Sequence, residues 1–118
     1  MATKRGSYVP QRGDLIWLNF DPQAGHEQAG RRPAVVLSPG SYNAKTHLAV
    51  CCPITSKAKG YPFEVPLPDR FAIRGVVLSD QLKSLDWHAR EAEFIASLPA
   101  PVLLELLRKA SLLVTPGN

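Results

Sequence analysis

Hydrophobic residues along this 118-residue chain fall in short runs that turn-forming residues separate. Eleven prolines and eight glycines interrupt the apolar runs at close intervals. Short apolar runs bounded by proline and glycine favour β-strands joined by turns. We therefore expect five or six short strands. The predicted strands cover residues 15–20, 33–37, 47–54, 63–67, 76–85 and 93–96.

Two of these runs alternate regularly enough to assign faces, because successive side chains of a strand point to opposite sides. In the run 47–54 the more apolar face carries Leu48, Val50, Cys52 and Ile54. Counting by twos places Thr55 on the other face, at the strand end. In the run 76–85 the same counting places Asp80 on an apolar face. A carboxylate there needs a partner, either a structural one or the edge of a bound base.

The C-terminal segment predicts the one long helix. Pro101 fits its first turn, and the apolar residues that follow form one stripe at helical spacing. The stripe consists of Val102, Leu103, Leu106, Leu107, Ala110, Leu113 and Val114. Leu104 and Leu112 fall outside it. Ser38 followed by Pro39 resembles an N-cap and first helical position, so a short helical turn is expected near residues 39–44.

The element pattern indicates a small, strongly bent sheet or partly open barrel with a terminal helix. No internal repeat, low-complexity tract or linker divides the chain, so we expect one domain over residues 1–118. The apolar runs are too short to span a membrane, and the N-terminal segment lacks the apolar core of a secretory signal. A cytoplasmic protein without membrane association is the expectation.

Cysteine and histidine usage gives no sign of a metal site or a disulfide framework. Cys51 and Cys52 are adjacent, so a disulfide between them would be strained, and in a strand they point to opposite faces. His26, His47 and His88 show no spacing typical of metal ligands. We expect neither a metal nor another cofactor.

The charge distribution suggests an anionic partner. The formal net charge is +4, and residues 1–60 carry eight Lys and Arg against three Asp and Glu. Residues 61–118 carry six against seven. A basic half often marks nucleic-acid binding, although many small basic proteins bind none.

The polar segment between the first two predicted strands is the strongest candidate for chemistry. It contains His26, Glu27, Gln28, Arg31 and Arg32. Loops held by a rigid scaffold carry function disproportionately, and the proline at position 33 favours an extended backbone at the preceding arginine. A solvated turn is the alternative interpretation.

A second basic loop follows Thr55 and contains Lys57 and Lys59. The threonine hydroxyl at a strand end suits hydrogen bonding to a phosphate oxygen, and the two lysines suit a phosphate backbone. An ordinary turn threonine is again the alternative.

Several motifs together resemble the MazF/PemK family of toxins over residues 8–115. The principal ones are Gly13-Asp14-Leu15-Ile16-Trp17, the run from Glu27 to Pro39 (EQAGRRPAVVLSP), and Asp80-Gln81-Leu82-Lys83-Ser84. Shorter matches are Tyr42-Asn43, Pro53-Ile54-Thr55 and the run from Lys59 to Val65. Each fragment is weak alone, whereas the ordered set is specific.

The resemblance implies an SH3-like barrel, mainly β with a C-terminal helix, of the CcdB/MazF/PemK type and assembled as a homodimer. It implies metal-independent cleavage of single-stranded RNA, usually mRNA, at a short motif. The 2′-hydroxyl would attack the adjacent phosphorus and leave a 2′,3′-cyclic phosphate and a 5′-hydroxyl. The implied partner is a MazE-type antitoxin.

The resemblance also assigns roles to individual residues. The catalytic residues would be Arg32, Thr55 and Glu27. RNA-contacting positions fall on Gln28, Asp80 and Gln81. The remaining candidates rest on their own chemistry and not on fixed family positions. Arg31, Lys57 and Lys59 would add affinity for phosphate through their charge. His26 is either a variable loop residue that contacts RNA or, beside Glu27, a general acid.

Three other functions compete with the ribonuclease interpretation. A gyrase-poisoning toxin of the CcdB kind shares the fold but binds a protein. A noncatalytic nucleic-acid-binding module would retain RNA without cutting it. A plain interaction module rests on fold analogy alone.

Overall fold

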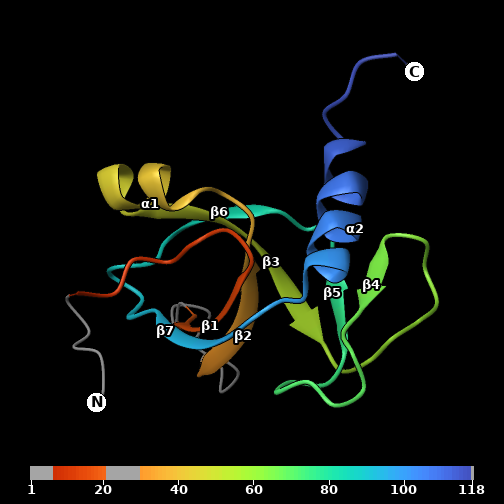
Figure 1. Ribbon diagram of the computed structural model, residues 1–118, viewed down its shortest axis with the longest axis horizontal. Helices are drawn as coiled ribbons and strands as arrows, with labels where there is room; N and C mark the ends of the chain where they lie inside the picture. The colour runs from red at the N-terminus through yellow and green to blue at the C-terminus, as the bar shows by residue number, and fades with distance from the viewer. Residues whose placement is uncertain (1–6, 21–29, 118) are drawn as a thin grey trace.

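The computed structural model describes residues 7–20 and 30–117, which form a bent antiparallel sheet and two helices (Figure 1). The strands are β1 (Asp14–Asn19), β2 (Arg31–Val36), β3 (Leu48–Thr55), β4 (Glu64–Pro66), β5 (Val76–Leu78), β6 (Lys83–Asp86) and β7 (Glu93–Ser97). The helices are α1 (Gly40–Thr46) and α2 (Ala100–Ser111). The mainly β fold with a C-terminal helix confirms the predicted SH3-like barrel class.

The strands follow the order β4-β5-β3-β2-β1-β7, and β6 pairs with β3 off this path. The long strand β3 is therefore shared: its first half pairs with β6 and its end pairs with β5. Sharing one strand between two partners bends the sheet. In Figure 1 the β4–β5 hairpin lies on one side of the molecule and β1, β2 and β7 on the other.

The prediction of one continuous strand over residues 76–85 is wrong. Between the pairs Cys51–Lys83 and Ile54–Val77, two residues of β3 face five residues of the partner segment. The chain turns at Ser79, whose backbone N–H and hydroxyl both donate to the carbonyl of Phe63. Because Phe63 is distant in sequence, the local alternation of residues 76–85 carries no sign of this break.

Both faces of the sheet are buried, which explains why apolar residues occur at consecutive positions in several strands. One core cluster contains Leu15, Val35, Cys52 and Val77 and packs against Leu106 of α2. The other contains Ile16, Leu18, Ala34, Val36, Ala49, Cys51 and Trp87. The predicted alternation in β3 is confirmed, but its second face is also largely apolar and buried rather than open to solvent.

The short helix α1 confirms the predicted helical turn but not its cap. Pro39 occupies the N-cap position and makes no side-chain cap hydrogen bond. The hydroxyl of Ser38 instead donates to Oδ1 of buried Asn43 at 2.6 Å and accepts the backbone N–H of Val50 at 2.8 Å. Ser38 therefore ties α1 to β3.

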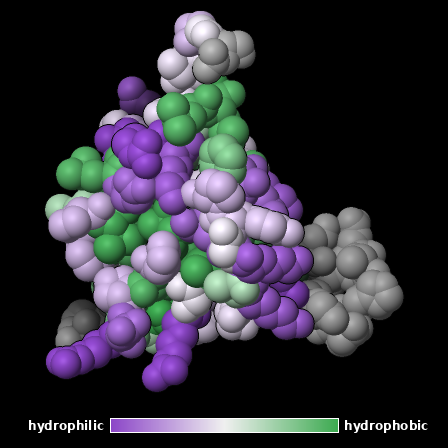
Figure 2. Space-filling view, turned by 90° about the vertical axis from the view of Figure 1, so that its right-hand side faces the viewer, coloured by the Kyte–Doolittle hydropathy of each residue, from purple (hydrophilic) through white to green (hydrophobic). Residues whose placement is uncertain are grey.

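Helix α2 buries part of its predicted stripe. Leu106 and Ala110 are buried, and Val102, Leu103 and Leu107 pack against the same core cluster. Leu113 and Val114 lie beyond the last helical residue and are exposed, so their assignment to the stripe is wrong. Figure 2 shows hydrophobic side chains gathered at this upper end of the face that carries α2. Within the described ranges no helix is long and apolar enough to cross a membrane.

Candidate active site

Arg32 and Thr55 line the same hollow at the open end of the β2–β3 pair. The last paired residues of these strands are Ala34 and Pro53. If the same register continued for two more residues, Arg32 would lie opposite Thr55. The strand ends diverge here (Figure 1). The hollow between them has a volume of about 300 Å³, at the small end of ligand pockets. The sequence predicted both residues, and the structure brings them together.

Arg32 lies in strand β2, whereas the sequence placed it at the end of the loop. It shares a face with Ala34 and Val36, and its guanidinium carbon lies 5.8 Å from the centre of the Phe20 ring. This arrangement is a cation–π contact, and none of the five N–H donors bonds to a described residue. No ion pair joins Arg32 to another residue of 7–20 or 30–117. The arginine is therefore exposed, oriented and unneutralised by the described part of the chain.

The hydroxyl of Thr55 accepts a hydrogen bond but donates none to a described residue. Its Oγ1 accepts the backbone N–H of Lys57 at 3.1 Å, which fixes the side chain at the start of the basic loop. Among the described residues no acceptor takes its proton. The hydroxyl is thus oriented as a donor for a ligand oxygen in the hollow.

Arg31 points away from this hollow. Its guanidinium donates to Oδ1 of Asn19 at 2.7 Å, to the carbonyl of Glu91 at 2.8 Å, and to the carboxylate of Glu93 at 3.2 Å. These bonds tie β2 across β1 to the start of β7. The structure separates Arg31 from Arg32 and Thr55, and a contact between Arg31 and RNA stays a prediction.

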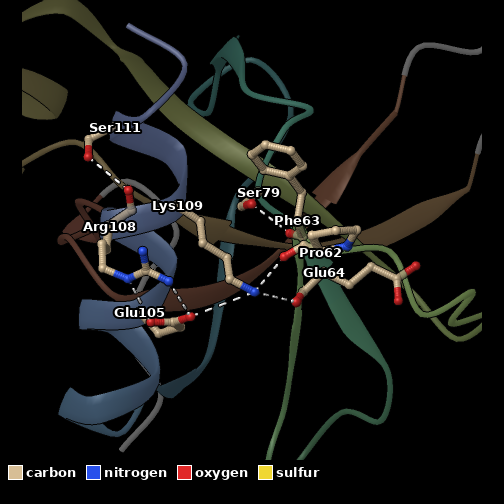
Figure 3. Close-up of polar contacts among 8 residues, drawn as sticks. All are labelled: Pro62, Phe63, Glu64, Ser79, Glu105, Arg108, Lys109 and Ser111. Atoms are coloured by element: carbon tan, nitrogen blue, oxygen red, sulfur yellow. Dashed lines mark hydrogen bonds and ion pairs between the residues drawn. The ribbon is translucent and has the colours of Figure 1, made fainter. Parts of the chain in front are cut away.

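The loop with Lys57 and Lys59 is anchored by the buried residue Glu64. Its carboxylate accepts the backbone N–H groups of Lys59 and Gly60 at 2.9 and 3.0 Å. Behind Glu64, the ammonium of Lys109 donates to the carbonyls of Pro62 and Glu64 (Figure 3). Helix α2 therefore supports β4, and β4 anchors the loop. Both loop lysines are exposed, and the backbone of Lys57 contacts Thr55.

Asp80 and Gln81 lie in the turn between β5 and β6 and are exposed. The prediction that Asp80 shares a buried apolar face is wrong, because the strand ends before it. The structure does not bring either residue to the hollow of Arg32 and Thr55. Their proposed contacts with RNA remain untested predictions.

Glu27, Gln28 and His26 lie outside the described residues, so their predicted roles are not addressed by the geometry. Within residues 7–20 and 30–117 no cluster of three His, Cys, Asp or Glu side chains has a metal-binding arrangement. Cys51 and Cys52 are free and buried. Burial raises the pKa of each thiol to about 12, with a smaller contribution from Asp80 at Cys52.

The structure adds one basic residue that the sequence analysis missed. Arg74, together with Ile73, lines the hollow that contains Arg32 and Thr55. It stands just before Gly75 at the entrance to β5, a position with the same local pattern as Arg32 at the entrance to β2. An arginine directly before a predicted strand was the sequence signal that could have identified Arg74.

Comparison with known proteins gives consistent matches over most of the chain. Residues 11–114 match the family described as PemK-like, MazF-like toxin of type II toxin-antitoxin system. The endoribonuclease toxin MazF of Escherichia coli strain K12 is 54% identical over 101 residues, which cover 86% of this chain and 89% of that protein. The endoribonuclease PemK of Escherichia coli is 36% identical over 110 residues, covering 89% and 82%.

A solved structure agrees with these sequence matches. The MazE–MazF crystal structure (form II) from Deinococcus radiodurans superposes with a TM-score of 0.87 and 58% identity. The superposition covers 92% of this chain and 97% of that chain. Similarity therefore extends through the barrel and the C-terminal helix.

Proposed function

This chain belongs to the PemK/MazF family of type II toxins and is an endoribonuclease, and we propose that it cuts single-stranded RNA by 2′-hydroxyl attack. The O2′–phosphorus bond forms while the phosphorus–O5′ bond breaks. The products are a 2′,3′-cyclic phosphate and a 5′-hydroxyl end. No metal takes part, because the nucleophile and the charge-stabilising groups are supplied by the RNA and the protein.

The observation that carries this proposal is the shared hollow of Arg32 and Thr55. In-line phosphoryl transfer concentrates negative charge on the nonbridging oxygens of the phosphate. A guanidinium with free N–H donors matches that geometry with two parallel hydrogen bonds. Arg32 stabilises this charge and does not exchange its own proton, because a guanidinium group holds its proton too tightly to serve as an acid or base.

Thr55 and Glu27 complete the catalytic set. The Thr55 hydroxyl, whose proton has no acceptor in the described part of the chain, donates to the same phosphate. Glu27 accepts the proton of the 2′-hydroxyl as general base. The leaving O5′ takes a proton from water or from His26, the one imidazole in that loop.

A second group of residues is proposed to contact RNA outside the reacting phosphate: Lys57, Lys59, Arg31, Gln28, Asp80 and Gln81. The two lysines have the clearest support, since their loop begins at Thr55 and is anchored by Glu64. Exposed cations beside the reacting phosphate strengthen binding by displacing counterions. The substrate is mRNA in the cytoplasm.

We further propose that the single domain of residues 1–118 works as a homodimer and is inhibited by a MazE-type antitoxin. The Deinococcus radiodurans relative is described as a MazE–MazF complex, which supports an antitoxin partner for this chain. An acidic antitoxin segment would complement the basic residues around Arg32 and Thr55.

The competing interpretations receive less support. The similar Escherichia coli proteins are named endoribonucleases, which favours catalysis over passive RNA retention. Their names also favour RNA over gyrase as the target. The separate Arg32–Thr55 hollow is unnecessary for a plain interaction module.

The experiment is incubation of the purified protein with a long single-stranded RNA in EDTA, followed by mapping of the product ends. Discrete fragments with 5′-hydroxyl ends support the proposal and reveal the cut motif. A 2′-deoxy substitution at the nucleotide before the cut should then block cleavage. Intact RNA across varied sequences overturns the proposal, and activity that returns only with a divalent ion overturns metal independence.

A further inference from the structure

Arg74 separates two adjoining hollows on this side of the molecule. The first contains Arg32 and Thr55. The second, of about 330 Å³, is lined by Ala58, the segment 66–69 and the stretch 74–76. Arg74 contributes to both walls, so a chain-like ligand that fills one hollow can continue past its guanidinium into the other.

The backbone next to Arg74 is fixed against the catalytic threonine. Thr55 pairs with Val76 in the β3–β5 ladder. Gly75 has φ +132°, and a Cβ at this position would overlap the carbonyl oxygen of Thr55. The close approach therefore requires glycine, and it holds the residue before it at a set position relative to Thr55. Arg74 is placed by the same strand pairing that places the reacting groups.

The two hollows differ in chemistry. The first contains Arg32, Arg74 and hydroxyl groups and has no acidic residue in its lining. The second is walled by Pro66, Leu67, Pro68 and Val76, with Asp69 as its one carboxylate. A phosphate suits the first and is repelled by Asp69 in the second. A base suits the second, because its faces pack on apolar side chains and an exocyclic amino group donates to a carboxylate.

The side chain of Arg74 is available for such a ligand. It is exposed, and it forms no hydrogen bond or ion pair with another described residue, Asp69 included. An arginine fork between two pockets suits bidentate recognition of a phosphate.

We propose that Arg74 binds the RNA phosphate adjacent to the scissile one and that the second hollow holds the base of the nucleotide attached to it. This inference rests on the proposed RNA cleavage at Arg32 and Thr55. It extends the site by one nucleotide and assigns Arg74 as an RNA-binding residue that contributes mainly to affinity. Because the Asp69 carboxylate can accept a hydrogen bond from an exocyclic amino group, the second hollow favours cytosine, adenine or guanine over uracil, which has no such group.

The test compares Arg74→Ala with Arg70→Ala and Arg74→Lys. Arg70 is an exposed arginine of the same loop that lines neither hollow, so its removal controls for the loss of one positive charge. The probe is an RNA that the wild type cuts, made uncleavable by 2′-deoxy substitution at the cut. Its dissociation constant is measured over a range of salt concentrations.

We expect Arg74→Ala to weaken binding about tenfold and to reduce the slope of log affinity against log salt by about 0.7, the value for one single-strand phosphate contact. Arg70→Ala should stay within about twofold of wild type, and Arg74→Lys should fall between. Equal affinity of Arg74→Ala and Arg70→Ala overturns the inference.

A second measurement locates the nucleotide. Two series of uncleavable RNAs are made, in which one nucleotide after another is removed from the 5′ end or from the 3′ end until the cut is reached. For wild type, one of these deletions should weaken binding strongly, and the same deletion should have little further effect in Arg74→Ala. Equal effects of every deletion in both proteins overturn the inference while leaving cleavage intact. A wild-type protein that cuts no RNA defeats the proposed function and the inference together.

Discussion

Arg31 and Arg32 are neighbours in β2, but their guanidinium groups lie on opposite faces of the sheet and have opposite environments. Arg31 makes three hydrogen bonds to Asn19, Glu91 and Glu93. Arg32 lies over the ring of Phe20 and has no ion pair with the described residues. One arginine is therefore suited to holding strands together and the other to binding an anion.

The first prediction contrasts these two arginines. Arg32→Ala should lower the cleavage rate at saturating RNA by at least about 10²–10³-fold, because it removes the main charge-stabilising group. Its unfolding midpoint should change little, since the side chain is exposed. Arg31→Ala should lower the free energy of unfolding by about 1 kcal/mol through its lost hydrogen bonds.

Single-turnover cleavage and urea unfolding of both variants check this contrast. Arg31→Ala should retain a saturated cleavage rate within about threefold of wild type, while any contact of Arg31 with RNA would appear as weaker binding. Wild-type rates in Arg32→Ala would remove it from the catalytic set.

The second prediction concerns the hydroxyl of Thr55. Thr55→Val keeps the shape but removes the donor, so the saturated cleavage rate should fall about 10- to 100-fold. Thr55→Ser keeps both the donor and the acceptor for the Lys57 N–H, and it should retain most of the activity. Loss of activity in Thr55→Ser together with retained activity in Thr55→Val would instead indicate a packing role for the γ-methyl group.

The third prediction tests the contact between Gly75 and Thr55. Gly75→Ala should destabilise the protein by about 2–4 kcal/mol, because the new Cβ meets backbone atoms and the φ of +132° is strained for other residues. It should also reduce cleavage by moving the end of β3. Thermal unfolding and cleavage rates measure the two effects.

Gly60→Ala is the matched control for this change. Gly60 also has a positive φ, +80°, but a Cβ there meets nothing within 4 Å. Its cost should be limited to about 1–2 kcal/mol from the backbone conformation. Similar losses of stability in the two variants would show that the overlap with Thr55 is unimportant.

The fourth prediction concerns alkaline pH. Cys51 and Cys52 have pKa values of about 12 in the folded state, whereas unfolded thiols ionise near pH 8.5. Between these values the unfolded state releases protons that the folded state keeps, so the free energy of unfolding should fall as pH rises from about 9 towards 12. Below about pH 8 this dependence should vanish.

Urea unfolding at several pH values measures this slope, and replacement of both cysteines by alanine should reduce it. In the native protein at pH 8 both thiols should also resist iodoacetamide and react only after denaturation. Rapid modification of the folded protein would contradict their burial.

Much of the fold follows from local sequence patterns. The apolar run of β1 and the alternation in β3 predicted these strands within one residue of their observed bounds. The helical spacing of Val102, Leu106 and Ala110 predicted α2, although the predicted stripe continued three residues beyond its end at Ser111. The failures have non-local causes. The strand over 76–85 breaks because Ser79 bonds to Phe63, and Ser38 is not a cap because its hydroxyl bonds to Asn43 and Val50.

The sequence by itself determined the positions of most strands, the two faces of β3, and that basic residues gather in the first half. These properties depend on neighbours along the chain, because side-chain direction alternates locally. The sequence did not determine that Arg32 and Thr55 meet, that Arg74 joins them, or that Arg31 is excluded. Those relationships depend on the register of β2, β3 and β5, and register is set by burying both faces of the sheet at once.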